Sequence, residues 1–168
     1  MMLANIVNGR PTTKAKNRAT LIVASPALVT QWSHEIEKHC LSKREQPQYG
    51  IGTVITHRAG NRLNTNNNQE LLEQADIVLT TYHEVARSYP KAIVPPNLIT
   101  AKQKDEWWKA HYEQEKGLLH RVTFYRVVLD EAQAIKNHRG HTSMACRALE
   151  SKHNWAITGT PIMNTVKE

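Results

Sequence analysis

Two adjacent carboxylates, Asp130 and Glu131, close an apolar run with the sequence YRVVLDEAQ. Mg²⁺ prefers hard oxygen ligands, keeps several waters and takes one or two carboxylates together with phosphate oxygens. The first carboxylate could hold the ion through water, and the second could orient or deprotonate the water that attacks a phosphate. The pair therefore points to a nucleotide hydrolase. A strand ending in Asp-Glu is also an ordinary way to begin a helix, and taken alone the two interpretations weigh equally.

Five short runs rich in β-branched and apolar residues surround this pair and predict the strands that must position it. Each is followed by turn-forming or polar residues; the runs are Thr20–Ala24, Thr53–His57, Asp76–Thr80, Arg126–Leu129 and His153–Thr158. Helical stripes lie between them, with Leu28, Trp32 and Ile36 on one and Met144, Ala145, Ala148 and Leu149 on another. The alternation predicts an α/β fold whose strands run parallel and whose chemistry lies beyond their carboxyl ends.

A phosphate-binding loop would read G-x-x-x-x-G-K-[ST], in which backbone amides wrap the phosphates and a lysine reaches the outer two. None of the seven glycines in the chain precedes a lysine, so no Walker A loop is present. The first residues, MMLANIVNG, instead form an apolar helical run that ends at Gly9.

Four segments occur in an order that identifies a family: LIVASPALVTQWSHEIEKH, DIVLTTYHEV, YRVVLDEAQAIKN and NWAITGTPIMN. They resemble motifs Ia, Ib, II and III of the Swi/Snf-like ATPases, the chromatin-remodelling and DNA-repair members of helicase superfamily two. The resemblance covers most of 21–164, apart from divergent stretches at 41–74 and 88–123. It implies a RecA-like lobe of the P-loop NTPase type, with a mostly parallel sheet flanked by helices. The insert before motif II is reminiscent of the repair-linked branch, whose members often carry a RING finger elsewhere.

The resemblance implies roles for motif II and motif III. Asp130 would coordinate Mg²⁺ and Glu131 would activate water, in agreement with the interpretation from the residues themselves. Gln133 stands where many relatives have His, which leaves Mg²⁺ binding untouched but threatens the usual hydrogen bond between motifs II and III. The residues that would couple nucleotide state to DNA binding are Gln133, Thr158, Gly159, Thr160 and Pro161. Taken without the resemblance, the run TGTP is first of all a tight turn.

Motifs Ia and Ib are implied to border the DNA backbone, where hydroxyls and backbone amides are suitable phosphate donors. The residues concerned are Ser25, Pro26, Gln31, Thr80, Thr81 and Tyr82. Trp32 also matches motif Ia, but its place on an apolar helical stripe favours packing in the core over contact with DNA.

The resemblance also implies which parts of an ATPase this chain carries. We expect 1–168 to be a partial N-terminal RecA-like lobe, with an insert at about 88–123, because the opening helix resembles the one that follows the Walker A loop in relatives. The strand and loop of Walker A, and the second lobe that supplies arginine fingers in the family, are not in the sequence. A protein carrying this chain is expected to couple hydrolysis of ATP, with Mg²⁺, to movement on duplex DNA, whereas the chain alone is expected to be inactive.

Composition is consistent with this interpretation. Lys and Arg exceed Asp and Glu by 22 to 15, which gives a formal charge of +7 and favours contact with phosphate backbones. The partners that the resemblance implies are double-stranded DNA and nucleosomes. No apolar run approaches the roughly 20 residues that span a bilayer. Cys40 and Cys146 lie on separate predicted helices and are expected to be reduced thiols, and the implied work on chromatin places the protein in the nucleus.

Two alternatives remain open at this stage. The chain could be a non-catalytic remnant that binds DNA or a partner through motifs Ia and Ib, or an unrelated magnesium phosphotransferase that uses Asp130 alone. The second leaves three motifs unexplained. Within the insert, residues 102–119 are expected to form one charged helix that packs Trp108, Tyr112 and Leu119 onto the lobe.

Overall fold

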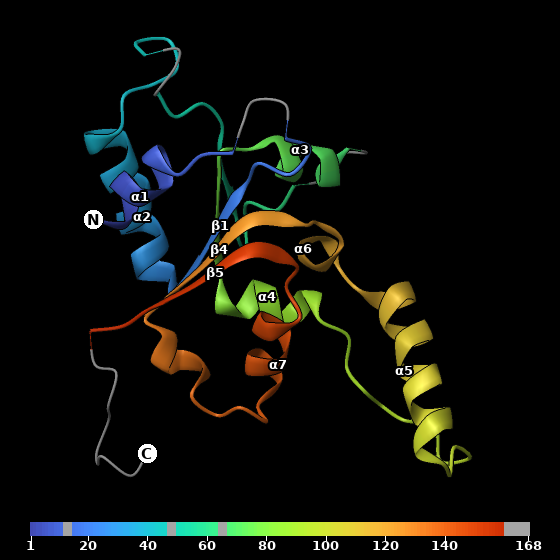
Figure 1. Ribbon diagram of the computed structural model, residues 1–168. Coiled ribbons are helices and arrows are strands. Elements are labelled where there is room, and N and C mark those ends of the chain that lie inside the picture. Colours follow the sequence, from blue (N-terminus) through green and yellow to red (C-terminus); the bar gives the residue numbers. More distant parts are fainter. Residues whose placement is uncertain (12–14, 47–49, 64–66, 160–168) are drawn as a thin grey trace.

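The computed structural model describes residues 1–11, 15–46, 50–63 and 67–159. Thr160 and Pro161, two residues of the predicted coupling motif, lie outside these ranges. All five predicted strands are present and together form one sheet, shown in Figure 1. They are β1 (Thr20–Ala24), β2 (Val54–His57), β3 (Ile77–Thr81), β4 (Phe124–Asp130) and β5 (Ser151–Ile157).

The sheet has the order β2-β3-β1-β4-β5, and every neighbouring pair is parallel. The expected parallel α/β fold is thereby confirmed. Strands β1 and β3 are buried along their whole length, which explains their continuous apolar sequence, since both faces of a parallel sheet are covered by helices. In the centre, Ile22 of β1 pairs in register with Leu79 on one side and Val128 on the other.

Helices divide between the two faces of the sheet. On one face α1 (Met2–Asn8) and α2 (Pro26–His39) pack Ile6, Val29 and Ile36 against Ile22 and Leu79. The opposite face is covered by α3 (Asn68–Gln74), α4 (Tyr82–Ser88), α6 (Leu118–Arg121) and α7 (His141–Arg147). Alternate residues of each strand therefore enter different cores, and the helices fix all the strand ends relative to one another.

The insert contains α5 (Ala101–Glu115), a helix with no buried residue that projects from the body of the molecule in Figure 1. The expected single helix over 102–119 is wrong, because α5 ends at Glu115 and Leu119 belongs to the separate α6. Gly117 lies between them and donates its backbone N–H to Ser88 O at 2.8 Å. A Cβ at Gly117 would approach the Ser88 Oγ to 2.9 Å, so this close contact requires glycine and interrupts the helix.

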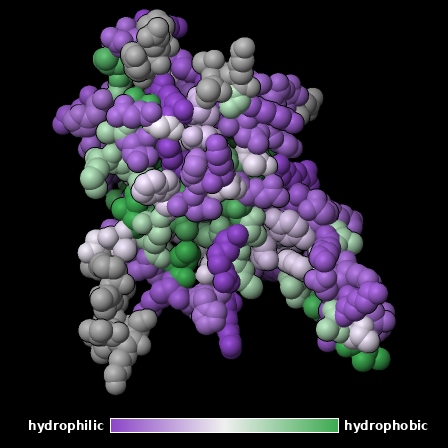
Figure 2. Space-filling view, in the orientation of Figure 1, coloured by the Kyte–Doolittle hydropathy of each residue, from purple (hydrophilic) through white to green (hydrophobic). Residues whose placement is uncertain are grey.

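The base of α5 packs on the lobe as expected, whereas the segment that leads into its far end carries exposed apolar residues. The ring of Tyr89 lies 5.7 Å from the rings of both Trp108 and Tyr112. At the far end, just before α5 begins, Ile93 and Ile99 are 79% and 84% exposed, and Figure 2 shows hydrophobic residues there. Within the described ranges, none of the helices has the length and apolar character needed to cross a membrane.

Candidate functional site

The carboxylate pair lies at the carboxyl edge of the sheet, where β4 ends beside β5. Asp130 is the last residue of β4 and pairs in register with Ile157, the last residue of β5. Glu131 follows with φ 52° and ψ 55°, a left-handed conformation that is costly for a side chain other than glycine. A short 3₁₀ helix, η1 (Ala132–Ile135), begins directly after it. Asp130 and Glu131 are both half-buried, so solvent-borne ligands can reach them.

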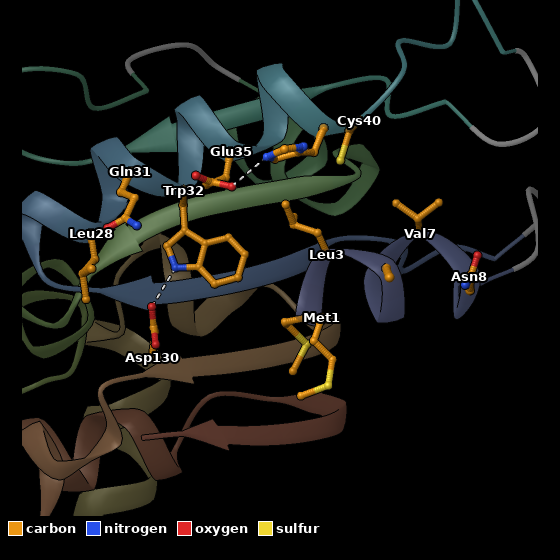
Figure 3. Close-up of a pocket in the computed structure, with 13 residues that line it drawn as sticks. Met1, Leu3, Val7, Asn8, Leu28, Gln31, Trp32, Glu35, Cys40 and Asp130 are labelled. Atoms are coloured by element: carbon orange, nitrogen blue, oxygen red, sulfur yellow. Dashed lines mark hydrogen bonds and ion pairs between the residues drawn. The ribbon is translucent and has the colours of Figure 1, made fainter. Parts of the chain in front are cut away.

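The carboxylate of Asp130 is held by one N–H donor on each oxygen. Trp32 Nε1 donates to Oδ2 at 2.8 Å, and the backbone N–H of Glu131 donates to Oδ1 at 3.0 Å. Figure 3 shows the indole of Trp32 directed at Asp130. A carboxylate offers about four lone-pair sites, so two remain for the waters of a metal ion. The Asp130 carboxylate is thus held in one orientation and can still accept hydrogen bonds from the waters of a metal ion.

The expectation that Trp32 belongs to the core is only half correct. Its ring packs against the core cluster beneath α2, but its ring nitrogen serves the site. Sequence patterns do not predict this bond, because the two residues are 98 positions apart.

Gln133 links the end of β4 to the end of β5. Its Nε2 donates to Glu131 Oε2, and Thr158 Oγ1 donates to Gln133 Oε1 at 2.7 Å. The expectation that glutamine at this position threatens the bond between motifs II and III is therefore wrong. An amide carries both a donor and an acceptor, so it can bridge a carboxylate and a hydroxyl as well as a neutral imidazole can. Thr158 directly follows β5 and is half-buried, and Gly159 after it is exposed.

The residues assigned to DNA lie at the starts of two helices on this same edge. Ser25 is the N-cap of α2 and its Oγ accepts the N–H of Leu28 at 3.4 Å; Pro26 is the first helical residue. Thr81 is the N-cap of α4 and its Oγ1 accepts the N–H of Glu84 at 3.3 Å. Each capping hydroxyl accepts a bond from its helix and keeps its own hydrogen. Ser25 is half-buried and can offer this hydrogen to a phosphate oxygen, whereas Thr81 is only 6% exposed.

Other members of the two motifs are engaged within the fold. Thr80 is buried and its Oγ1 donates to the backbone oxygen of His57 at 2.7 Å. The Tyr82 hydroxyl donates to the backbone oxygen of Asp130 at 2.8 Å. Burial, with smaller contributions from Cys146 and Asp130, raises the pKa of Tyr82, so the hydroxyl keeps its hydrogen. Gln31 is exposed on α2.

Two arginines near this edge were not foreseen. Arg62 forms a two-pronged ion pair with Glu84 in the first turn of α4, with N–O distances of 2.9 and 2.7 Å. Arg58, directly after β2, donates to Thr30 Oγ1 on α2 at 3.3 Å. Arg62 restrains the start of α4, and Arg58 adds positive charge beside α2. Arg58 and Arg62 lie in a stretch without helical or strand periodicity, so the sequence pattern did not predict either contact.

A groove of about 790 Å³ opens between α1 and α2, with Asp130 at its border. Its wall is largely apolar and includes Leu3, Val7, Leu28 and Trp32, as Figure 3 shows. Among the residues that the structure describes, no three His, Cys, Asp or Glu side chains gather to enclose a metal. A single oriented Asp carboxylate suits Mg²⁺, which takes its remaining ligands from water and phosphate.

Comparison with known proteins gives a consistent result. The model of the SNF2-related domain matches residues 1–168. The helicase-like transcription factor CHR28 of Arabidopsis thaliana is 29% identical over 89% of this chain and 17% of its own length. The DNA repair protein RAD5A of the same plant is 31% identical over 91% of this chain and 12% of its own. The chain spans less than a fifth of the length of these relatives.

A solved structure shares the fold. The SWI2/SNF2 ATPase core of Sulfolobus solfataricus in complex with dsDNA aligns with a TM-score of 0.54 and 22% identity, over 98% of this chain and 26% of that one. The alignment confirms the expected RecA-like arrangement of a parallel sheet flanked by helices.

Proposed function

The chain belongs to the SNF2-related domain family, and on that basis we propose that it forms the metal- and water-handling part of a DNA-dependent ATPase. The protein that carries it would translocate on duplex DNA and move or strip bound proteins. The observation that supports this most strongly is the position of Asp130 and Glu131 at the carboxyl edge of β4, joined through Gln133 to Thr158, which directly follows the neighbouring strand β5.

Asp130 would hold Mg²⁺ through water. Its two oxygens are fixed by Trp32 and by the Glu131 backbone, so the remaining lone pairs have set directions before the ion arrives. When bound, Mg²⁺ neutralises charge on the phosphates of ATP. The groove beside Asp130 leaves room for a ligand at this border of the sheet.

Glu131 would orient and deprotonate the attacking water. Its left-handed backbone turns the side chain away from the line of β4, and Gln133 holds one carboxylate oxygen. The other oxygen carries no bond within the described residues that would compete for a water. Because Thr158 is bonded to Gln133, a change in the hydrogen bonds of Glu131 and Gln133 would shift Thr158 and the segment that follows it. This is the coupling role proposed for 158–161.

Duplex DNA is the proposed partner, bound along the starts of α2 and α4. The capping hydroxyl of Ser25 would contact a phosphate, and Pro26, Gln31, Thr81 and Tyr82 would border the DNA backbone. The positive charge of the chain supports such contact. A relative named as a DNA repair protein and a solved relative in complex with dsDNA support the same partner. The proposal extends to a nuclear location and to nucleosomes among the targets.

Substitution of the helix cap tests the DNA assignment. Ser25→Asp keeps a good N-cap but places a negative charge where a phosphate is expected. We expect duplex affinity, measured by fluorescence anisotropy at fixed salt, to fall about tenfold or more, since a hydrogen bond to a charged group contributes ~1.5–3 kcal/mol. Thr100→Asp makes the same change at the cap of α5 and should leave affinity unchanged. Equal affinities for both variants would rule out the assignment.

Measurement of phosphate release tests whether this chain can hydrolyse ATP without a phosphate-binding loop. Without a phosphate-binding loop, 1–168 should show no DNA-stimulated release of phosphate from ATP. Turnover by this chain that Glu131→Gln abolishes would overturn the proposal that the phosphate-holding part is supplied from elsewhere.

A further inference from the structure

Asp130 is contacted from two helices that lie on opposite faces of the sheet. Trp32 of α2 packs against one core cluster and donates to the side chain of Asp130. Tyr82 of α4 packs against the other core cluster and donates to the backbone oxygen of the same residue. Both bonds are 2.8 Å long. The end of β4 is therefore held from both faces by aromatic side chains that lie far away in the sequence.

The same two helices begin at the residues assigned to DNA. Tyr82 directly follows the cap residue Thr81, and Trp32 lies seven positions after the cap residue Ser25, two turns along α2 on the same helical face. A helix moves as a rigid unit over two turns. A shift of either helix start on binding a phosphate would therefore displace a donor that acts on Asp130.

The start of α4 is restrained against independent movement. Glu84, in the first turn of the helix, is 4% exposed and is paired with Arg62 through both of its carboxylate oxygens. The start of α4 is thus connected to the segment after β2 through Arg62, and to Asp130 through Tyr82. No comparable contact reaches Asp130 from β2 within the described ranges, so the two aromatic side chains are the direct links.

We propose that Trp32 and Tyr82 are positioning residues that couple DNA binding at the starts of α2 and α4 to metal binding at Asp130. This inference rests on the proposed function and extends it by naming the physical link between its two sites. Since coupling between binding sites is reciprocal, DNA should strengthen metal binding by the same factor by which the metal strengthens DNA binding. Aromatic side chains that served only to pack the core would give no such dependence.

Titration of the purified chain with Mg²⁺, with and without saturating duplex DNA, tests the link. The backbone N–H of Glu131, which donates to Asp130, serves as the reporter in amide NMR spectra. In the unaltered chain we expect DNA to raise the apparent Mg²⁺ affinity by about fivefold or more, the lower end of typical coupling. Tyr82→Phe keeps the ring and removes only the hydroxyl, whereas Trp32→Phe keeps an aromatic side chain but replaces the indole and its N–H. Each should bring the ratio toward one.

Matched variants show whether the effect is specific. Trp155→Phe on β5 and Tyr125→Phe on β4 make the same chemical changes away from Asp130 and should keep the full ratio. Tyr82→Phe removes a single oxygen, so it provides a test even if Trp32→Phe fails to fold. An undiminished ratio in both variants, or a ratio of one in the unaltered chain, would overturn the inference while leaving metal binding at Asp130 intact. Mg²⁺ affinity that is unchanged in Asp130→Asn would overturn the proposed function as well.

Discussion

At the scale of single residues, Gln133 fixes the direction of the two hydrogen bonds that it makes in the site. Its amide nitrogen can only donate and its oxygen can only accept, which matches Glu131 on one side and the Thr158 hydroxyl on the other. This match does not change near neutral pH, because the amide does not titrate.

Exchange of Gln133 for histidine should introduce a pH dependence. Neutral imidazole can donate to Glu131 and accept from Thr158, but imidazolium has no acceptor, so the link to Thr158 is lost as pH falls through the ordinary histidine pKa of about 6.5. In a form of the protein that hydrolyses ATP, Gln133→His should therefore retain kcat above that pH and lose it below. The pH profile of kcat measures this. A profile as flat as that of the unaltered protein would show that the Thr158 bond has no part in hydrolysis.

Residue types predicted the carboxylates of the site but not their supporting bonds. Asp130 and Glu131 were recognisable because a strand leads directly into them. Trp32, Tyr82 and Arg62 act through contacts between segments far apart in the chain, and helical periodicity describes only which face of a helix is apolar. A tryptophan on such a face therefore gave no indication that its ring nitrogen has a partner.

At the scale of elements, Asp76 fixes the turn that enters β3. Its carboxylate accepts from Lys43 at 2.9 Å, from the Gly52 backbone at 2.7 Å and from Arg18 at 3.0 Å. Burial alone would raise the pKa of Asp76, but the bonds from Lys43, Gly52 and Arg18 outweigh it and lower the pKa below its ordinary value of 3.8. One side chain thus joins the segments that precede β1, β2 and β3.

The lowered pKa of Asp76 predicts how stability depends on acid. A carboxyl group whose pKa is lower in the folded state contributes its full stabilisation above the unfolded value, and loses it as pH falls from about 3.8 through the folded pKa. Asp76→Asn should lower the unfolding free energy at neutral pH by ~1–3 kcal/mol and reduce the acid sensitivity. Urea unfolding at several pH values measures both effects. Asp105→Asn, which removes an exposed pair with Lys109, is the control and should change little.

The strands were easier to predict than the helices of the insert. The central strands β1 and β3 are recognisable as continuous apolar runs because both of their faces are buried. The half-buried β2 and the exposed β5 are recognisable from their β-branched and aromatic residues and the turn-forming residues that follow. The insert was misjudged because the spacing of Trp108, Tyr112 and Leu119 is helical throughout, while the contact of Gly117 with Ser88 is a tertiary feature. Local periodicity does not predict a close contact between backbone segments that are far apart in the sequence, such as Gly117 and Ser88.

At the scale of the whole molecule, β5 presents an open edge. It pairs with β4 on one side and, among the described residues, with no strand on the other. Five of its seven residues are exposed, including Trp155 at 43%. An exposed edge with apolar side chains is a site where further strands can pair.

This edge predicts self-association of the isolated chain. Light scattering should show an apparent mass that rises with protein concentration, and Trp155→Lys should suppress the rise because a charged side chain blunts edge pairing. Ile99→Lys removes a more exposed apolar residue away from the sheet and should have little effect. A chain that stays monomeric at all concentrations, or one that responds only to Ile99→Lys, would show that the β5 edge is not the site of association.

Metal binding by the carboxylate pair is tested most directly with Mn²⁺, which accepts the same oxygen ligands as Mg²⁺ and broadens the NMR signals of nearby nuclei. We predict that Mn²⁺ broadens the backbone amide of Glu131 and the indole N–H of Trp32 first, and that Asp130→Asn abolishes this while Asp76→Asn, a change at another half-buried carboxylate, does not. Broadening centred on another part of the chain, or unchanged in Asp130→Asn, would contradict the assignment of Asp130 and Glu131 as the metal and water end of an ATPase.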